Sequence, residues 1–236
     1  MSLLEIEALR VGYGFPVLMG ISFVVEQGER AVLFGLNGAG KTTTVATVAG
    51  LLRPEAGTIR FDGEDITTKT AADRVAMGIA LVPEGRRVFP ALSVANNLRL
   101  GAWTRRKRHQ EIDEARELVF DYFPRLAERA DQLAGTLSGG EQQMLAIGRG
   151  LMSRPRLLLV DEASLGLSPA LTKTVFSVMD RINADGVTVV LVEQNIGVLP
   201  HADRALIMEK GTLVYQGSGD EIHSASLRET YLGTPA

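Results

Sequence analysis

One eight-residue stretch constrains the fold of this 236-residue chain more than any other. It reads Gly35-Leu36-Asn37-Gly38-Ala39-Gly40-Lys41-Thr42 and matches the pattern G-x-x-x-x-G-K-[ST]. A short apolar run over residues 30–34 precedes it, and a helical pattern over about residues 41–51 follows it. Because a glycine-rich turn between a strand and a helix directs backbone N–H groups around a phosphate, the stretch predicts an α/β fold with a phosphate-binding loop.

The same loop supplies side chains for a nucleotide. We expect Lys41 to reach the β- and γ-phosphates, and the Thr42 hydroxyl to join the ligand shell of a Mg²⁺ ion. Thr43 follows directly and is expected in the same site.

A buried strand that ends in two carboxylates is the second chemical feature. The apolar run over residues 157–160 leads into Asp161 and Glu162. Mg²⁺ takes oxygen ligands, so Asp161 suits the metal shell. Glu162, one residue further on, is placed to polarise the attacking water as a general base. The alternative interpretation is that the two carboxylates cap a helix.

A heptapeptide, Leu137-Ser138-Gly139-Gly140-Glu141-Gln142-Gln143, predicts a second anion site. Two glycines expose backbone N–H groups beside a serine hydroxyl, and a helical pattern runs from Glu141 to about Ser153. Backbone donors at a helix N-terminus attract anions. We therefore expect Ser138, Gly139, Gly140 and Glu141 to contact a nucleotide, although one nucleotide does not need two such sites.

Strand and helix patterns alternate along most of the chain. Strands are predicted at residues 3–11, 17–27, 30–34, 58–61, 79–82, 157–160, 187–192, 205–208 and 213–215. Buried apolar strands that alternate with helices indicate a largely parallel sheet. The more polar, mostly helical stretch from residue 92 to about 134 predicts a helical lobe inserted in the α/β body; with the heptapeptide it spans approximately residues 92–150. We interpret residues 1–236 as a single domain.

Composition narrows the functional classes. The chain has no cysteine, which excludes disulfides and thiolate metal sites. Its net charge of −3 gives no support to nucleic-acid binding, and no apolar run approaches the roughly 18 residues of a spanning helix. We expect a soluble intracellular chain, and these features are compatible with docking on a membrane protein. The basic run Arg105–Arg108 suggests nucleic acid or anionic lipid, but we favour a solvated helix face.

The phosphate loop, the heptapeptide and the acidic strand end, in that order, resemble the ATP-binding cassette (ABC) ATPases over essentially the whole chain. The resemblance implies a P-loop NTPase with a mostly parallel core sheet, an antiparallel β subdomain and an inserted α-helical lobe, and it implies ATP and Mg²⁺ as cofactors. It also implies a head-to-tail dimer in which Ser138 and the two glycines contact the γ-phosphate of ATP held by the other subunit. Tyr13, which by itself would be read as a packing residue, is assigned to stacking on adenine.

Two departures from the family pattern bear on the chemistry. The family commonly has glutamine where this chain has Glu84, and histidine where it has Gln194. A carboxylate at position 84 can ligate Mg²⁺; the alternative is that Glu84 pairs with Arg86 or Arg87. Gln194 can hydrogen-bond a γ-phosphate but cannot exchange a proton near neutral pH, so we expect it to position the phosphate and leave base catalysis to Glu162.

These departures, in Val82-Pro83-Glu84-Gly85-Arg86-Arg87 and Val192-Glu193-Gln194-Asn195, resemble one branch of the family, as does the ending Tyr231-Leu232-Gly233. The branch is the F-type ATPase subunit of bacterial high-affinity branched-chain amino acid importers. It implies an ATP-hydrolysing motor subunit that lies peripherally on the cytoplasmic face of the bacterial inner membrane. Its partners would be two permease subunits, a second ABC ATPase and, indirectly, a periplasmic or surface amino-acid-binding protein. We expect a paralogous heterodimer, or a homodimer when isolated, and no nucleic acid.

Other functions remain open at this stage. A urea or amide importer ATPase has similar motifs. ABC ATPases of DNA repair carry long heptad coiled coils, and those of translation usually carry two cassettes with a charged linker; this sequence has neither feature.

Overall fold

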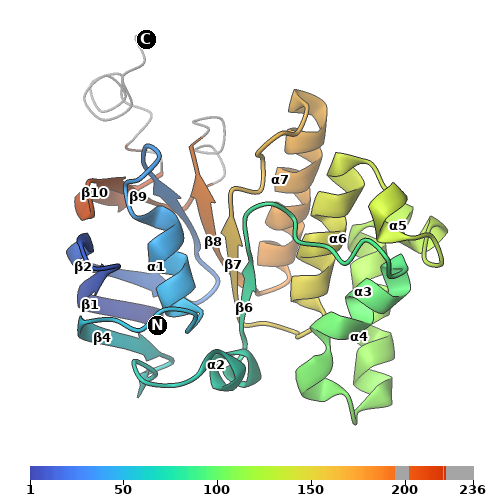
Figure 1. The fold of residues 1–236 in the computed structure, drawn as a ribbon, viewed down its shortest axis with the longest axis horizontal. Coiled ribbons are helices and arrows are strands. Elements are labelled where there is room, and N and C mark those ends of the chain that lie inside the picture. Colours follow the sequence, from blue (N-terminus) through green and yellow to red (C-terminus); the bar gives the residue numbers. More distant parts are fainter. Residues whose placement is uncertain (195–201, 220, 222–236) are drawn as a thin grey trace.

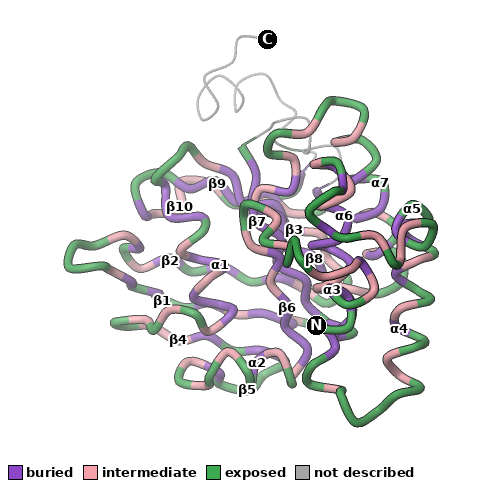
Figure 2. Tube along the Cα trace, turned by 45° about the vertical axis from the view of Figure 1, so that its right-hand side comes forward, coloured by how far each residue is buried: buried purple, intermediate pink, exposed green. Residues whose placement is uncertain are grey.

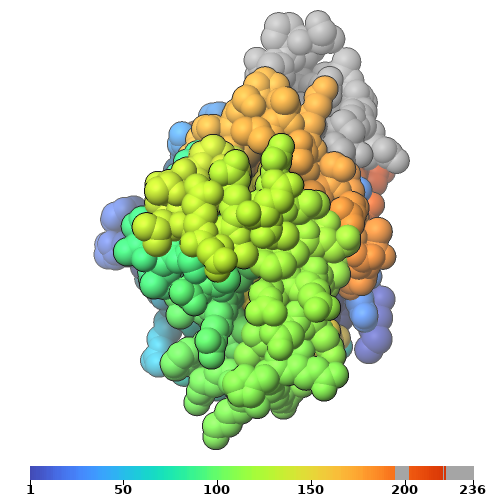
Figure 3. Space-filling view, turned by 90° about the vertical axis from the view of Figure 1, so that its right-hand side faces the viewer, coloured from blue at the N-terminus to red at the C-terminus, as the bar shows by residue number. Residues whose placement is uncertain are grey.

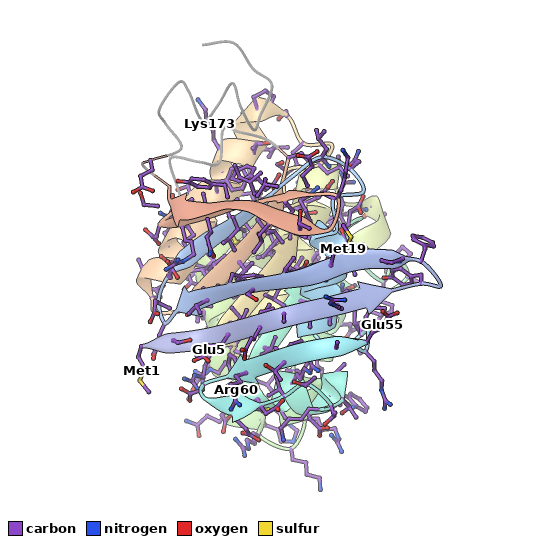
Figure 4. The ribbon with its side chains drawn as sticks, turned by 90° about the vertical axis from the view of Figure 1, so that its left-hand side faces the viewer. Met1, Glu5, Met19, Glu55, Arg60 and Lys173 are labelled. Carbon is purple, nitrogen blue, oxygen red and sulfur yellow. The ribbon has the colours of Figure 1, made fainter. Side chains whose placement is uncertain are left out.

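The computed structural model describes residues 1–194, 202–219 and 221 and contains two sheets (Figure 1). The predictions that involve Asn195 and Tyr231–Gly233 lie outside these residues. The smaller sheet is antiparallel throughout, and Figure 4 looks onto its outward face, where Glu5 and Arg60 lie opposite each other on neighbouring strands. Its strand order is β2 (Pro16–Glu26), β1 (Ser2–Gly12), β4 (Ala56–Phe61) and β5 (Glu64–Asp65).

The larger sheet forms the centre of the molecule. Its neighbouring strands are parallel except for β10, which pairs antiparallel with β9. The order is β10 (Thr212–Ser218), β9 (Arg204–Glu209), β3 (Arg30–Phe34), β8 (Thr188–Glu193), β7 (Leu157–Asp161) and β6 (Ile79–Val82). The predicted fold class, a mostly parallel core sheet with an antiparallel β portion, is confirmed.

Helices cover the larger sheet on both faces. In chain order the described helices are α1 (Lys41–Val48), α2 (Ala71–Met77), α3 (Val94–Gly101), η1 (Trp103–Arg105), α4 (His109–Tyr122), α5 (Pro124–Glu128), η2 (Ala134–Thr136), α6 (Gly139–Leu151) and α7 (Pro169–Ala184). Helix α1 lies between the two sheets, whereas α6 and α7 lie on the opposite side of the larger sheet (Figure 1).

Alternation along β3 divides the buried residues into two cores. Val32 and Phe34 pack with the helices α3 to α7, and Ala31 and Leu33 pack with α1 and the antiparallel sheet. Successive side chains of a strand point to opposite faces, so one apolar strand supplies both cores. Every residue of β7 and β8 is buried, as the tube in Figure 2 shows for the middle of the sheet.

Helices α3 to α6 lie between β6 and β7 in the chain and gather at one side of the molecule, where they cover much of the face in Figure 3. Two polar contacts join α4 to α7 and the residue that follows it. The Tyr122 hydroxyl donates to Asp185, and Arg181 forms an ion pair of 2.8 Å with Asp121. These contacts connect the helical group to the body of the molecule.

Two helix boundaries differ from the sequence prediction. Helix α1 ends at Val48, three residues before the predicted Leu51, because Gly50 has a left-handed φ of 80°. Helix α6 begins at Gly139, not at Glu141, because Ser138 is its N-cap: the Ser138 hydroxyl accepts from the Glu141 amide, and the Glu141 carboxylate accepts from the Ser138 amide. Both glycines of the heptapeptide therefore belong to the first helical turn.

The basic run lies at η1 and the turn before α4. Arg105 and Arg108 both pair with Glu111, and the guanidinium of Arg106 lies 5.2 Å from the ring centre of Trp103. Among the described residues, no helix is both long and apolar enough to cross a membrane.

Candidate nucleotide-binding site

A pocket of about 410 Å³ lies at the N-terminus of α1. Most of the residues predicted to bind or hydrolyse a nucleotide come together here from four separate stretches of the chain. The lining consists of Val17, Asn37, Gly38, Ala39, Gly40, Lys41, Thr42, Thr43, Glu84, Glu162, Leu165 and Gln194.

The loop before α1 presents backbone donors to this pocket. Gly40 is the N-cap of α1 with φ 105°, and no side chain caps the helix. A β-carbon at Gly40 would lie 2.7 Å from Cδ2 of Leu18, so only glycine fits both the conformation and the space. The first turn of α1 holds no acidic residue, and its free N–H groups therefore favour an anionic ligand.

Lys41 is the cation of the site and is only 4% exposed. Its Nζ donates to the carbonyl oxygens of Gly35 at 2.7 Å and Leu36 at 3.1 Å. Burial lowers the pKa of Lys41, and the carboxylates of Glu162 and Asp161 act in the opposite direction. The phosphate-binding loop thus holds the Lys41 ammonium group at the pocket through these two hydrogen bonds.

Asp161 lies at the buried end of β7 with 2% exposure. Burial raises the pKa of Asp161 to about 6, although a hydrogen bond with Thr42 opposes the shift. The Oδ1 oxygen of Asp161 is buried without a hydrogen-bond partner. A buried carboxylate oxygen with no partner, next to a hydroxyl, fits the oxygen shell of Mg²⁺.

Protein groups alone do not make a closed metal site here. Within the described ranges, no three side chains of the types His, Cys, Asp and Glu gather closely enough to hold a metal ion. Mg²⁺ usually retains waters and binds through one or two carboxylates plus substrate phosphates. The set of Thr42, Asp161 and Glu84 is consistent with that mode of binding.

Glu162 stands in a rare backbone conformation, with φ 49°. Its amide donates to the Val192 carbonyl at 2.9 Å, and its carboxylate accepts a hydrogen bond from the Gln194 side-chain amide. The two residues predicted to act on the attacking water and the γ-phosphate therefore meet at the ends of the adjacent strands β7 and β8.

Glu84 follows β6 and lines the pocket. The alternative pairing considered from the sequence is not formed by its carboxylate: among the described residues, no ion pair joins Glu84 to Arg86 or Arg87. Arg87 instead donates from Nε to the backbone carbonyl of Glu84 at 3.3 Å. The carboxylate therefore remains available to the pocket.

Several predicted residues lie outside the lining, among them the buried Asp161. Tyr13 lies in the turn between β1 and β2 and is 53% exposed. Val17, near the start of β2, does line the pocket. Gly35 and Leu36 line an adjoining cavity of about 360 Å³ beside β9. Ser138, Gly139, Gly140 and Glu141 form the start of α6 outside the lining, and Glu141 also pairs with Arg129 at 3.0 Å.

The structure adds contacts that the sequence did not reveal. A methyl group on Gly139 would lie 2.9 Å from both terminal nitrogens of Arg86, whose guanidinium is also near Gly166. The buried Glu193 carboxylate accepts two hydrogen bonds from Ser164. These contacts join residues far apart in the chain, so no local pattern signals them.

The fold and the site together define a P-loop nucleotide-binding protein. Residues 18–165 match the family model described as ABC transporter. The chain is 42% identical over 234 residues to the high-affinity branched-chain amino acid transport ATP-binding protein BraG of Pseudomonas aeruginosa, covering 98% of this chain and 100% of that protein. It is 31% identical to a probable branched-chain amino acid transport ATP-binding protein, LivF, of Archaeoglobus fulgidus, covering 91% of each.

Solved structures agree with these relatives. The crystal structure of an ATP-binding cassette of an ABC transporter in its ADP conformation superimposes with a TM-score of 0.86 at 27% identity, covering 99% of this chain and 100% of that one. The chain belongs to the ABC transporter family and is an ATPase of that family.

Proposed function

We propose that this chain is the ATP-hydrolysing motor subunit of an importer for branched-chain amino acids. The observation that carries the ATPase part is the pocket in which the phosphate loop, Glu162 and Gln194 meet. The cargo follows from the Pseudomonas relative, which is named for this transport and matches almost the full chain.

In the proposed binding step, ATP phosphates lie along the loop. The amides at the start of α1 and the Lys41 ammonium group contact the β- and γ-phosphate oxygens. Thr42, Asp161 and Glu84 would hold Mg²⁺, which when bound neutralises the charge of the phosphates. Tyr13 would stack on the adenine from its hairpin.

In the proposed hydrolytic step, the Glu162 carboxylate orients a water molecule and accepts its proton as the water oxygen bonds to the γ-phosphorus. The bond from that phosphorus to the β–γ bridging oxygen breaks, and ADP and inorganic phosphate are the products. The Gln194 side-chain amide donates to the Glu162 carboxylate, and this hydrogen bond fixes the orientation of the carboxylate. Gln194 can also hydrogen-bond the γ-phosphate. Gln194 has no proton to exchange near neutral pH, so it contributes positioning only.

We further propose that the start of α6 serves a second nucleotide. Ser138, Gly139, Gly140 and Glu141 lie outside the pocket of their own chain, as expected if they contact ATP held by the other subunit of a head-to-tail dimer. Residues 92–150 would then be a helical lobe within a single ABC ATPase domain over residues 1–236. The lobe and the loop from Glu84 to Phe89 would transmit nucleotide-driven closure to the permeases.

The proposed assembly contains two permease subunits and a second ABC ATPase, expected to be a paralogue, on the cytoplasmic face of the bacterial inner membrane. An amino-acid-binding protein outside that membrane would act on it indirectly. Purification of the intact complex tests this assembly. Recovery of both permeases and the second ATPase, with ATP hydrolysis stimulated by the binding protein loaded with leucine, isoleucine or valine, is expected. Stimulation only with a urea-loaded or amide-loaded binding protein would contradict the cargo.

Glu162→Gln tests the chemistry. The variant should reduce turnover by about 10²–10⁴ because it removes the base. ATP should still bind, because the loop, Lys41 and Thr42 are unchanged. Steady-state hydrolysis and equilibrium ATP binding measure the two effects, and turnover within a few-fold of the unmodified protein would remove Glu162 from its assigned role.

A further inference from the structure

Glu193 is a buried carboxylate with no role in the steps above. It ends β8, a strand otherwise apolar beyond its first residue, and it is 2% exposed. Each carboxylate oxygen accepts a hydrogen bond from Ser164: Oε1 from the Ser164 amide at 3.0 Å and Oε2 from the Ser164 hydroxyl at 2.7 Å.

A carboxylate in this place is unfavourable unless it is well hydrogen-bonded. Burial raises the pKa of Glu193 to about 6, even though the hydrogen bonds from Ser164 lower it. An apolar residue would extend the buried strand at no such cost. The side chain therefore has a specific task in its contact with Ser164.

The contact lies beside the proposed catalytic pair. Ser164 is two residues after Glu162, and Gln194 directly follows Glu193. The same two stretches are also joined by the hydrogen bond from the Glu162 amide to the Val192 carbonyl and by that from Gln194 to Glu162. The Glu193 side chain thus adds two partly buried hydrogen bonds between the two stretches that carry the catalytic pair.

Glu162 needs such a link because its own backbone conformation is strained. A φ of 49° is unfavourable for a residue with a side chain and persists only where the surroundings impose it. The loop that leaves Glu162 also brings Leu165 into the pocket lining. If Ser164 moved, both Glu162 and this part of the lining would move with it.

We propose that Glu193 is a positioning residue for ATP hydrolysis: by holding Ser164 through two hydrogen bonds, it keeps Glu162 and Gln194 in their mutual geometry at the pocket. This inference rests on the catalytic roles proposed above. Glu193 acts through Ser164 and does not contact the nucleotide.

Glu193→Ala in the purified transporter complex tests this role. We expect kcat to fall about tenfold or more, because small displacements of catalytic groups are costly. The KM for ATP, and the ATP affinity of the isolated chain, should change by less than about twofold, because Lys41 and Thr42 lie on other elements.

Thr188→Val is the matched control. Thr188 is a fully buried polar residue at the other end of β8, where its hydroxyl accepts from the Gly28 amide at 2.8 Å. The control also loses a partly buried hydrogen bond on this strand, but it should retain kcat. An equal fall of kcat in both variants would show that general destabilisation of β8 lowers the rate, and not the loss of the hydrogen bonds between Glu193 and Ser164.

Glu193→Gln distinguishes a role of the Glu193 hydrogen bonds from a role of its negative charge. Its carbonyl oxygen can accept from the Ser164 amide and its amide group can donate to the Ser164 hydroxyl, so kcat should recover to within about threefold, with an unchanged pH–rate profile. If the Gln variant is as slow as the Ala variant, or if its pH–rate profile is shifted, the positioning role of Glu193 is wrong and an electrostatic role is favoured.

Ser164→Ala provides a variant that leaves the buried strand intact. It should lower kcat less than Glu193→Ala, and the double variant should be no slower than Glu193→Ala alone, because both changes remove one interaction. Additive losses would contradict the proposal. If Glu162→Gln is slow but Glu193→Ala is not, only this inference fails; if Glu162→Gln itself retains turnover, the proposed function fails first.

Discussion

Glu162, Arg86 and Arg87 have positive φ angles of 49°, 62° and 46°. Each costs of order 1–3 kcal/mol for a residue with a side chain. All three lie on loops that leave the C-terminal ends of β6 and β7, the edge of the sheet where the pocket forms. At these three positions the strain coincides with the edge of the sheet that carries the pocket, whereas Ala8, Asp62, Arg154 and Lys210 have positive φ angles elsewhere in the molecule.

Arg86 also lies close to Gly139. Its guanidinium occupies the space that a side chain at Gly139 would need, since a β-carbon there would lie 2.9 Å from its terminal nitrogens. Alanine is normally better than glycine in a helix by up to about 1 kcal/mol. Gly139 is the first residue of α6, so in an Arg86→Ala background Gly139→Ala should raise the free energy of unfolding by at most about 1 kcal/mol.

With Arg86 present, the same change should give a smaller gain or a loss, because the guanidinium must move. Urea unfolding of the four proteins of this cycle measures the difference. Equal gains in both backgrounds would show that Arg86 exerts no constraint on Gly139.

At the scale of elements, α1 depends on α2 for its C-terminal end. Arg74 of α2 is 1% exposed and donates to the carbonyls of Thr47 at 2.7 Å and Val48 at 2.9 Å. It also donates to Thr67 and Lys69 carbonyls. Helix α1 has no basic residue in its last turn, so Arg74 supplies the cation that favours a helix C-terminus.

Arg74→Met should lower the free energy of unfolding by about 2–4 kcal/mol, because buried carbonyl groups lose their donors. Arg60→Met is the matched control: Arg60 is exposed on β4, and its loss should change stability by less than about 0.5 kcal/mol. Urea unfolding measures both. A loss at Arg74 no larger than at Arg60 would contradict its role as the cap of α1.

At the scale of the whole molecule, the start of α6 is proposed to bind the nucleotide of the other subunit, whereas the pocket binds the chain's own nucleotide. Ser138→Arg should lower turnover of the assembled ATPase by about 10²-fold or more, because it blocks the donors proposed for the other subunit's nucleotide. ATP affinity of the lone chain should change by less than about twofold, since Ser138 lies outside its own pocket.

Ser93→Arg is the matched control for this prediction. Ser93 caps α3 as Ser138 caps α6, so both variants lose about 1 kcal/mol of capping. Only Ser138→Arg should lower turnover to that extent. If Ser138→Arg weakens ATP binding by the lone chain as much as it slows hydrolysis, the motif serves its own nucleotide.

Most of the fold was predictable because its signals are local. The phosphate loop is read from eight consecutive residues, and the apolar runs of β7 and β8 identify buried parallel strands. The helix ends were less predictable: the end of α1 and the start of α6 depend on Gly50 and on the capping hydroxyl of Ser138.

The sequence by itself determined which groups are present and in what order: Lys41 and Thr42 in a glycine loop, and Asp161 and Glu162 at a strand end. These follow from short-range backbone chemistry. Only the tertiary structure decided that Gln194 meets Glu162 and that Glu193 holds Ser164. Those pairs arise because β7 and β8 are neighbours in the sheet, and strand order is set by the packing of both cores, which no local pattern encodes.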